Sequence, residues 1–185
     1  MPAPQRILLI SGSTRDGSTN TAALRTIAQG PPAGITAELY DGLAALPAFN
    51  PDDDGPRLPA AAAGLRRVIA EAGAVLFCTP EYAGTLPGSL KNLLDWTVGG
   101  GELDGKPAAW INVAHPGRGR GAEATLATVL GYVGARVAEA ACRQLPVTRD
   151  QIGPDGTVTD PGFRAEAAAT AAALARAAET AAAAR

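Results

Sequence analysis

Hydrophobic positions in this chain follow two alternating patterns. Short continuous apolar runs occupy residues 6–11, 35–40, 74–79 and 108–114, with a further candidate at 137–145. A strand buried on both faces is typically a continuous apolar run rather than an alternating one. Because longer stretches with helical spacing separate the runs, the sequence predicts parallel β-strands alternating with α-helices.

The stretches between the runs predict helices. Their apolar residues recur at helical spacing over residues 19–29, 65–72, 90–98 and 122–133, and glycines such as Gly30 and Gly73 follow directly. The alanine-rich stretch from about residue 160 to the end favours a terminal helix, because alanine has the highest helix propensity. Residues 46–59 hold four prolines and the acidic run Asp52–Asp54, which predicts a surface loop.

Composition then narrows the class of protein. The 185 residues, 46% of them hydrophobic, fit a single domain over residues 1–185. With 16 Lys and Arg against 18 Asp and Glu, the chain lacks the basic excess typical of nucleic-acid binding. We therefore expect no nucleic-acid partner.

The small numbers of cysteine and histidine residues and the short apolar segments restrict the possible site chemistry and the cellular location of the protein. Two distant cysteines, Cys78 and Cys142, and the single His115 favour a reducing compartment and no metal site. No apolar run is long enough for a signal-peptide core or a membrane span. We therefore expect a cytoplasmic protein with no membrane partner.

The loop after the first run indicates an anion-binding site. It places four hydroxyls and one guanidinium just before a predicted helix, on Ser13, Thr14, Arg15, Ser18 and Thr19. A helix N-terminus attracts phosphate, although Ser18 or Thr19 could simply cap the helix. Ser18 occupies the lysine position of a Walker loop, and the glycine spacing of a dinucleotide fingerprint is absent, so neither motif applies.

The loop after the third run suits a flat heterocycle. Residues 79–92 combine prolines and glycines, which expose backbone polar groups, with one aromatic side chain, Tyr82. Alternatively, Pro87 and Gly88 simply begin a helix. Cys78 precedes this loop, but position 84 is glycine where a phosphatase-type loop requires arginine.

Together the two loops resemble those of the NADPH-dependent FMN reductase family of flavodoxin-like reductases. The resemblance is carried by Gly12–Arg15, Gly17–Asn20, Pro80–Tyr82, Gly84, Leu86–Asn92 and Leu94–Trp96, and it runs from about residue 6 to residue 147. It implies a doubly wound five-stranded parallel sheet of order 2-1-3-4-5 with helices on both faces. It also implies that Leu46–Asn50 lies near the flavin of a partner subunit in a homodimer or tetramer.

The resemblance also assigns site residues. FMN phosphate is expected on Ser13, Arg15, Ser18, Thr19 and Asn20. The isoalloxazine ring is expected along Pro80, Glu81, Tyr82, Ala83 and Gly84, and beside His115 and Gly117 of the loop after the fourth run. Ala83 departs from the family, which commonly has asparagine there. Arg118 and Arg120 are unusual in that loop and are candidates for contacting NADPH or an anionic acceptor.

The predicted function is hydride transfer from NADPH or NADH to bound FMN and then to a small acceptor such as a quinone. No catalytic side chain is expected, because the flavin itself carries the chemistry. Two alternatives remain open: an FMN-binding electron carrier or flavin-transfer module, and a domain that binds another phosphorylated metabolite without redox chemistry.

Overall fold

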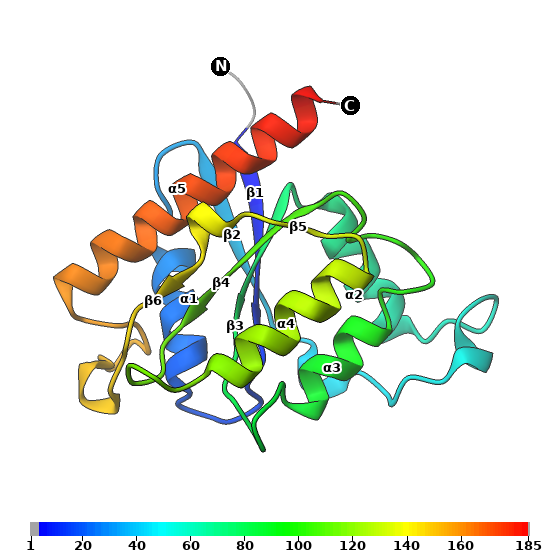
Figure 1. The fold of residues 1–185 in the computed structure, drawn as a ribbon, viewed down its shortest axis with the longest axis horizontal. Coiled ribbons are helices and arrows are strands. Elements are labelled where there is room, and N and C mark those ends of the chain that lie inside the picture. The colour runs from blue at the N-terminus through cyan, green and yellow to red at the C-terminus, as the bar shows by residue number, and fades with distance from the viewer. Residues whose placement is uncertain (1–3, 185) are drawn as a thin grey trace.

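A parallel β-sheet forms the centre of the molecule, and helices cover both of its faces (Figure 1). The computed structural model describes residues 4–184. The strands are β1 (Gln5–Ser11), β2 (Ile35–Tyr40), β3 (Ala74–Cys78), β4 (Pro107–Asn112), β5 (Arg136–Val137) and β6 (Arg143–Gln144). Their order is β2-β1-β3-β4-β5, and every pairing is parallel. The predicted strand order is confirmed.

Within residues 4–184, five α-helices connect or follow the strands. They are α1 (Thr19–Gln29), α2 (Ala60–Glu71), α3 (Gly88–Asp95), α4 (Arg120–Tyr132) and α5 (Pro161–Ala183). One core cluster joins α1 and α5 to one face of the sheet, and a second cluster joins α2, α3 and α4 to the other face. Leu76 belongs to the first cluster and its neighbour Phe77 to the second, because successive strand residues point to opposite faces.

The fifth strand differs from the prediction. Residues 137–145 do not form one strand: β5 and β6 each pair with β4, and a 3₁₀ turn (Glu139–Ala141) separates them. Alanine has low strand propensity, and the segment has three alanines between Val137 and Cys142. Ala141 is completely buried, so the turn adds to the core under α5 where a regular strand would not.

The predicted surface loop is a projecting but firmly attached arm, which we define as residues 46–58. Figure 1 shows it in cyan, projecting from the right-hand side of the body. The Asn92 side chain accepts a hydrogen bond from the Phe49 backbone N–H at 2.8 Å and donates one to the Pro47 carbonyl at 2.9 Å. The Trp96 indole N–H donates to the same carbonyl, and its ring packs edge-on against Phe49. These contacts fix the arm to α3.

A second attachment ties the far end of the arm to α2. The Arg66 guanidinium bonds Asp54 of the arm at 2.7 Å and the Trp96 carbonyl at 2.7 Å, and it lies 3.8 Å from Glu102. The three charged side chains are only 13–15% exposed. One guanidinium therefore holds together the arm, the end of α3 and the loop before β4.

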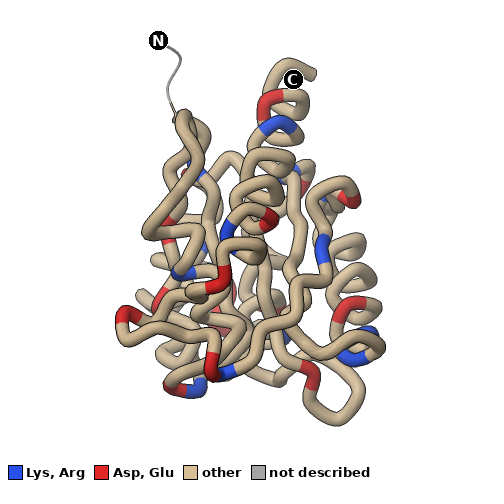
Figure 2. Tube along the Cα trace, turned by 90° about the vertical axis from the view of Figure 1, so that its left-hand side faces the viewer, with Lys and Arg blue, Asp and Glu red and all other residues tan. Residues whose placement is uncertain are grey.

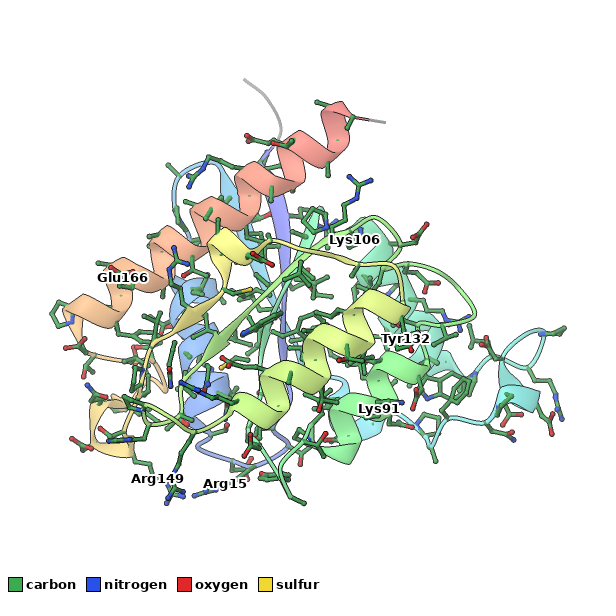
Figure 3. The ribbon with its side chains drawn as sticks, viewed as in Figure 1. Arg15, Lys91, Lys106, Tyr132, Arg149 and Glu166 are labelled. Atoms are coloured by element: carbon green, nitrogen blue, oxygen red, sulfur yellow. The ribbon has the colours of Figure 1, made fainter. Side chains whose placement is uncertain are left out.

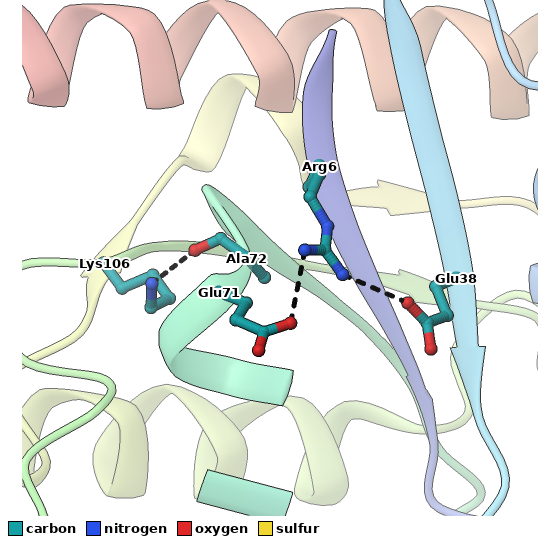
Figure 4. A network of polar contacts seen from close by, with 5 residues as sticks. All are labelled: Arg6, Glu38, Glu71, Ala72 and Lys106. Carbon is teal, nitrogen blue, oxygen red and sulfur yellow. Dashed lines mark hydrogen bonds and ion pairs between the residues drawn. The ribbon is translucent and has the colours of Figure 1, made fainter. Parts of the chain in front are cut away.

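At the opposite, amino-terminal edge of the sheet, polar contacts secure the end of α2. Figure 4 shows the Lys106 ammonium donating to the Ala72 carbonyl, and Arg6 between Glu71 and Glu38. A cation at a helix C-terminus is favourable because the last carbonyls carry partial negative charge. The Arg6 pairs are half exposed and contribute less than about 1 kcal/mol each.

Helix α5 lies across the first face of the sheet. Figure 2 shows charged residues only at intervals along it, between uncharged stretches. Asp160 caps its start, because the Phe163 N–H donates to the Asp160 carboxylate at 2.7 Å. Over residues 4–184, no helix is long and apolar enough to cross a membrane.

Candidate functional site

The loops that follow the strands gather at the carboxyl edge of the sheet, the lower edge in Figure 1. Arg15 and Arg149, from two of these segments, both lie at this edge (Figure 3). The first loop packs tightly on the end of β3. The Gly12 N–H donates to the Cys78 carbonyl at 2.9 Å, and a Cβ at Gly12 would lie 2.2 Å from the Thr79 hydroxyl oxygen. Only glycine allows this close approach of the two strand ends.

A cavity of about 630 Å³ opens between these loops. Its lining comes from four segments: Thr19 and Asn20; Thr79, Pro80 and Glu81; Val113, Ala114, His115 and Gly117–Gly121; and Pro146, Val147 and Thr148. The volume lies within the range of small-molecule and cofactor sites. The cavity also lies where open α/β sheets bind ligands, beyond the carboxyl ends of the strands.

The N-terminus of α1 offers donors for an anion. Ser18 is the N-cap, and its side chain accepts from the Thr21 N–H. Within residues 4–184, the backbone N–H groups of Ser18, Thr19 and Asn20 have no hydrogen-bond acceptor. These free donors and the positive end of the helix dipole suit a phosphate group.

The predicted phosphate residues divide between two neighbouring cavities. Thr19 and Asn20 line the 630 Å³ cavity. Ser13, Arg15 and Ser18 instead line a second cavity of about 320 Å³, between the first loop and the end of β2. The first loop therefore separates the two spaces, and the joint phosphate-binding role of these five residues stays a prediction.

The Asn20 side chain has a structural partner. The Cys78 thiol donates to the Asn20 carbonyl oxygen at 3.4 Å, and the Asn20 amide lies 3.5 Å from the Ser18 hydroxyl. Complete burial raises the pKa of the Cys78 thiol well above its ordinary value. Cys78 is therefore a protonated structural residue, and the Asn20 group without a partner in the described structure is its backbone N–H.

Residues 82–85 form a two-residue β-hairpin at the rim of the site. Tyr82 and Thr85 exchange backbone hydrogen bonds of 3.0 and 3.1 Å. The two residues between them, Ala83 and Gly84, have φ of 50° and 76°, the pattern of a type I′ turn. None of Tyr82, Ala83 and Gly84 lines the 630 Å³ cavity, so their predicted contact with the isoalloxazine requires the ring to extend to the rim.

The loop after β4 forms the opposite wall. Asn112 shapes it from within, because its amide donates to the Arg118 carbonyl at 3.0 Å and its side-chain oxygen accepts from the Ala114 N–H at 2.9 Å. The side chains of His115, Arg118 and Arg120 are exposed at the cavity. Among the described residues, neither arginine has an ion-pair partner, so both guanidinium groups are available to an anion.

The structure adds lining residues that the sequence analysis missed: Thr79, Val113, Ala114, Pro146, Val147 and Thr148. Each lies at or beyond the end of a predicted strand. The rule that ligands bind at the carboxyl edge therefore pointed to them.

The strand order, the free N-terminus of α1 and a cavity at the carboxyl edge define a flavodoxin-like α/β protein with a site for a phosphorylated ligand. Comparison with known sequences refines this class. Residues 5–146 match the NADPH-dependent FMN reductase family, and the chain belongs to that family.

Individual relatives agree with this assignment. Over 111 residues the chain is 40% identical to an NAD(P)H-dependent FMN reductase of Pseudomonas aeruginosa, a match covering 59% of this chain and 60% of the relative. A 2-hydroxy-1,4-benzoquinone reductase of a Burkholderia species is 33% identical over 112 residues, with the same coverage. These matches thus span about three-fifths of the curated relatives' length.

Among solved structures, the chain is similar to FerB, a flavoenzyme NAD(P)H:(acceptor) oxidoreductase of Paracoccus denitrificans. The two structures superpose with a TM-score of 0.73 at 28% sequence identity, and the match covers 95% of this chain and 98% of FerB.

Proposed function

We propose that this protein is an FMN-dependent oxidoreductase that takes hydride from NADPH or NADH and reduces a small quinone-like acceptor. One observation carries the proposal. One cavity joins the free backbone N–H groups of Thr19 and Asn20, at the start of α1, to the loops after β3 and β4. Such a site can hold a phosphate at one end and a flat ring at the other, which is the shape that FMN requires.

The donor set of the chain fits FMN. Residues proposed for the phosphate are Ser13, Arg15, Ser18, Thr19 and Asn20, and those proposed for the ring are Pro80, Glu81, Tyr82, Ala83, Gly84, His115 and Gly117. Bound FMN supplies the hydride-accepting ring, so the chain needs no nucleophile. The roles left to the protein are to bind the cofactor, to orient the second substrate and to restrict water.

Arg118 and Arg120 are proposed to contact the electron donor. Both are exposed at the cavity, and their guanidinium groups have no ion-pair partner among the described residues. Arginine binds phosphate through paired, charge-assisted hydrogen bonds. The 2′-phosphate of NADPH is the feature that would distinguish this donor from NADH.

The acceptor is proposed to be a small quinone-like molecule. Two observations support this choice: the cavity is open to solvent through its exposed rim, and relatives matched over part of their length are named as quinone reductases. An open site accepts and releases a planar acceptor without a dedicated channel.

We further propose a cytoplasmic homodimer formed through α4. The outer face of α4 carries no charge at Ala124, Ala127, Thr128 and Gly131. Tyr132, at the end of the helix, is 90% exposed. Aromatic residues such as tyrosine are enriched, and charged residues are depleted, at the centre of protein interfaces. No residue of the arm lines the cavity of its own chain, in agreement with the family resemblance, which implies that Leu46–Asn50 lies near the flavin of the partner subunit.

The visible absorption spectrum of the purified protein tests the proposal. We expect flavin bands to persist after FMN is added and the protein is desalted, and to bleach when NADPH is added anaerobically. Retained FMN that NADPH does not reduce would instead indicate an electron carrier or flavin-transfer module, the alternative that Ala83 in place of the family's asparagine leaves open. Loss of all FMN on desalting would show that the site binds another phosphorylated ligand.

A further inference from the structure

The side chain of Glu81 is directed at the start of α4. The backbone N–H groups of Gly121 and Ala122 donate to one Glu81 carboxylate oxygen, Oε2, at 2.7 and 3.1 Å. Helix α4 follows Gly119, which has no side chain to cap it. Glu81 therefore supplies the missing cap from a different loop, and a carboxylate is favoured there because a helix N-terminus carries partial positive charge.

Two further contacts join the hairpin 82–85 to α4. The Thr85 and Thr125 hydroxyls are hydrogen-bonded at 2.9 Å. Gly121 lies so close to the hairpin that a Cβ on it would come within 2.1 Å of the Gly84 carbonyl oxygen. Three successive contacts thus hold the loop after β3 against the first turn of the helix that follows β4.

Two of the residues that make these contacts, Glu81 and Gly121, also line the cavity. Arg120 is the first residue of α4, the helix that Glu81 caps, and Arg118 lies two residues before it. We propose that Glu81 is a positioning residue that fixes the two walls of the flavin cavity relative to each other through its carboxylate, rather than by contacting the cofactor with that oxygen. This inference rests on the proposed function, because it concerns the binding of FMN.

Three variants separate positioning from general stability. Glu81→Ala removes the bridge, and Glu81→Gln keeps an oxygen that can accept both N–H groups. Asp160→Ala is the matched control, because Asp160 caps α5 through the Phe163 N–H at 2.7 Å and does not line the cavity. The dissociation constant of FMN is measured by fluorescence titration of each apoprotein, and stability by urea unfolding.

We expect both alanine variants to have a lower free energy of unfolding, whereas only Glu81→Ala should bind FMN more weakly. Its dissociation constant should rise about tenfold, because the binding walls are no longer preorganised. Glu81→Gln should stay within about threefold of the unmodified protein, and Asp160→Ala within about twofold. Hydrogen exchange of the apoproteins gives a readout without ligand: Glu81→Ala should speed exchange in residues 82–85 and 119–122 together, and Asp160→Ala in neither segment.

A fourth variant distinguishes positioning from direct contact. Gly121→Ala keeps the Glu81 carboxylate in the chain but places a methyl group against the Gly84 carbonyl oxygen and Glu81 Oε2, so it should push the hairpin and this carboxylate away from α4 and also weaken FMN binding. Weakened binding in Glu81→Ala but not in Gly121→Ala would show direct contact and overturn the inference.

Equal FMN affinity in Glu81→Ala and the unmodified protein would overturn this inference alone. An unmodified apoprotein that binds no FMN would overturn the proposed function together with it.

Discussion

Ala83 occupies a left-handed backbone conformation, with φ of 50°, that alanine rarely adopts. The two-residue hairpin between Tyr82 and Thr85 imposes it, because a type I′ turn requires positive φ at both central positions. Asparagine is far better tolerated there than alanine. The residue that departs from the family pattern is therefore also a strained one.

We predict that Ala83→Asn raises the free energy of unfolding by about 0.5–1 kcal/mol, because asparagine reduces the strain of the left-handed conformation. Urea unfolding of the apoprotein measures the change. Ala169→Asn is the control, because Ala169 is exposed in the middle of α5, where asparagine should lower stability by about 0.5 kcal/mol. A less stable Ala83→Asn protein would contradict the assignment of the turn.

The second prediction at this scale concerns Arg118 and Arg120. Replacing both with alanine should raise the KM for NADPH about tenfold or more and change the KM for NADH little, because only NADPH carries a 2′-phosphate. Steady-state kinetics with a fixed quinone measure both values. Arg149→Ala is a suitable control, because Arg149 lies at the same edge without lining the cavity (Figure 3). Equal changes for the two donors would exclude a 2′-phosphate contact.

At the scale of the elements, the arm is a proline-rich segment without regular strands or α-helices that side-chain contacts attach to the body of the protein at two places. Its near end is bound to Asn92 and Trp96 of α3, and Asp54 at its far end pairs with the mostly buried Arg66. Glu102 Oε2 is buried without a hydrogen-bond partner in the described structure. The Arg66 guanidinium, 3.8 Å from the other Glu102 oxygen, is the positive charge that offsets the desolvation cost of burying this carboxylate.

We predict that Arg66→Met lowers the free energy of unfolding by about 3 kcal/mol, because it leaves two mostly buried carboxylates without their cation. It should also speed proteolysis within residues 46–58. Arg67→Met is the matched control, because Arg67 is the exposed neighbour in the same helix and should change stability by less than about 0.5 kcal/mol. Equal stability of the two variants would show that the pairing does not hold the arm.

At the scale of the whole molecule, the two faces of the sheet differ in what covers them. Helices α1 and α5 bury one face, while α2, α3 and α4 bury the other and leave the uncharged residues Ala124, Thr128 and Gly131 of α4 to solvent. The arm projects on the side of α2 and α3 (Figure 1). This asymmetry is the basis for proposing α4 as the contact between subunits.

We predict that Thr128→Arg converts a dimer into monomers, because it places a charge in the centre of the uncharged α4 face. Sedimentation velocity at micromolar concentration measures the mass. Ala169→Arg on α5 is the control and should leave the dimer intact. A dimer that persists in Thr128→Arg would place the subunit interface elsewhere.

The sequence by itself determined the strand order through its family resemblance, the bounds of α1, and the segments that form the carboxyl edge. The bounds of α1 and the segments of the carboxyl edge depend on local patterns: buried runs, helix propensity, and glycine or proline at boundaries. It also indicated the anion site, because a helix N-terminus preceded by hydroxyl-rich residues is a local feature.

Tertiary structure alone decided the split of residues 137–145, the attachment of the arm and the contact between Glu81 and the start of α4. In each case the deciding partner is distant in sequence: Glu81 meets Gly121, Asp54 meets Arg66, and the turn at Ala141 is stabilised by packing beneath α5. Such contacts depend on how strands and helices pack in three dimensions. Short-range periodicity carries no information about which distant residues that packing brings together.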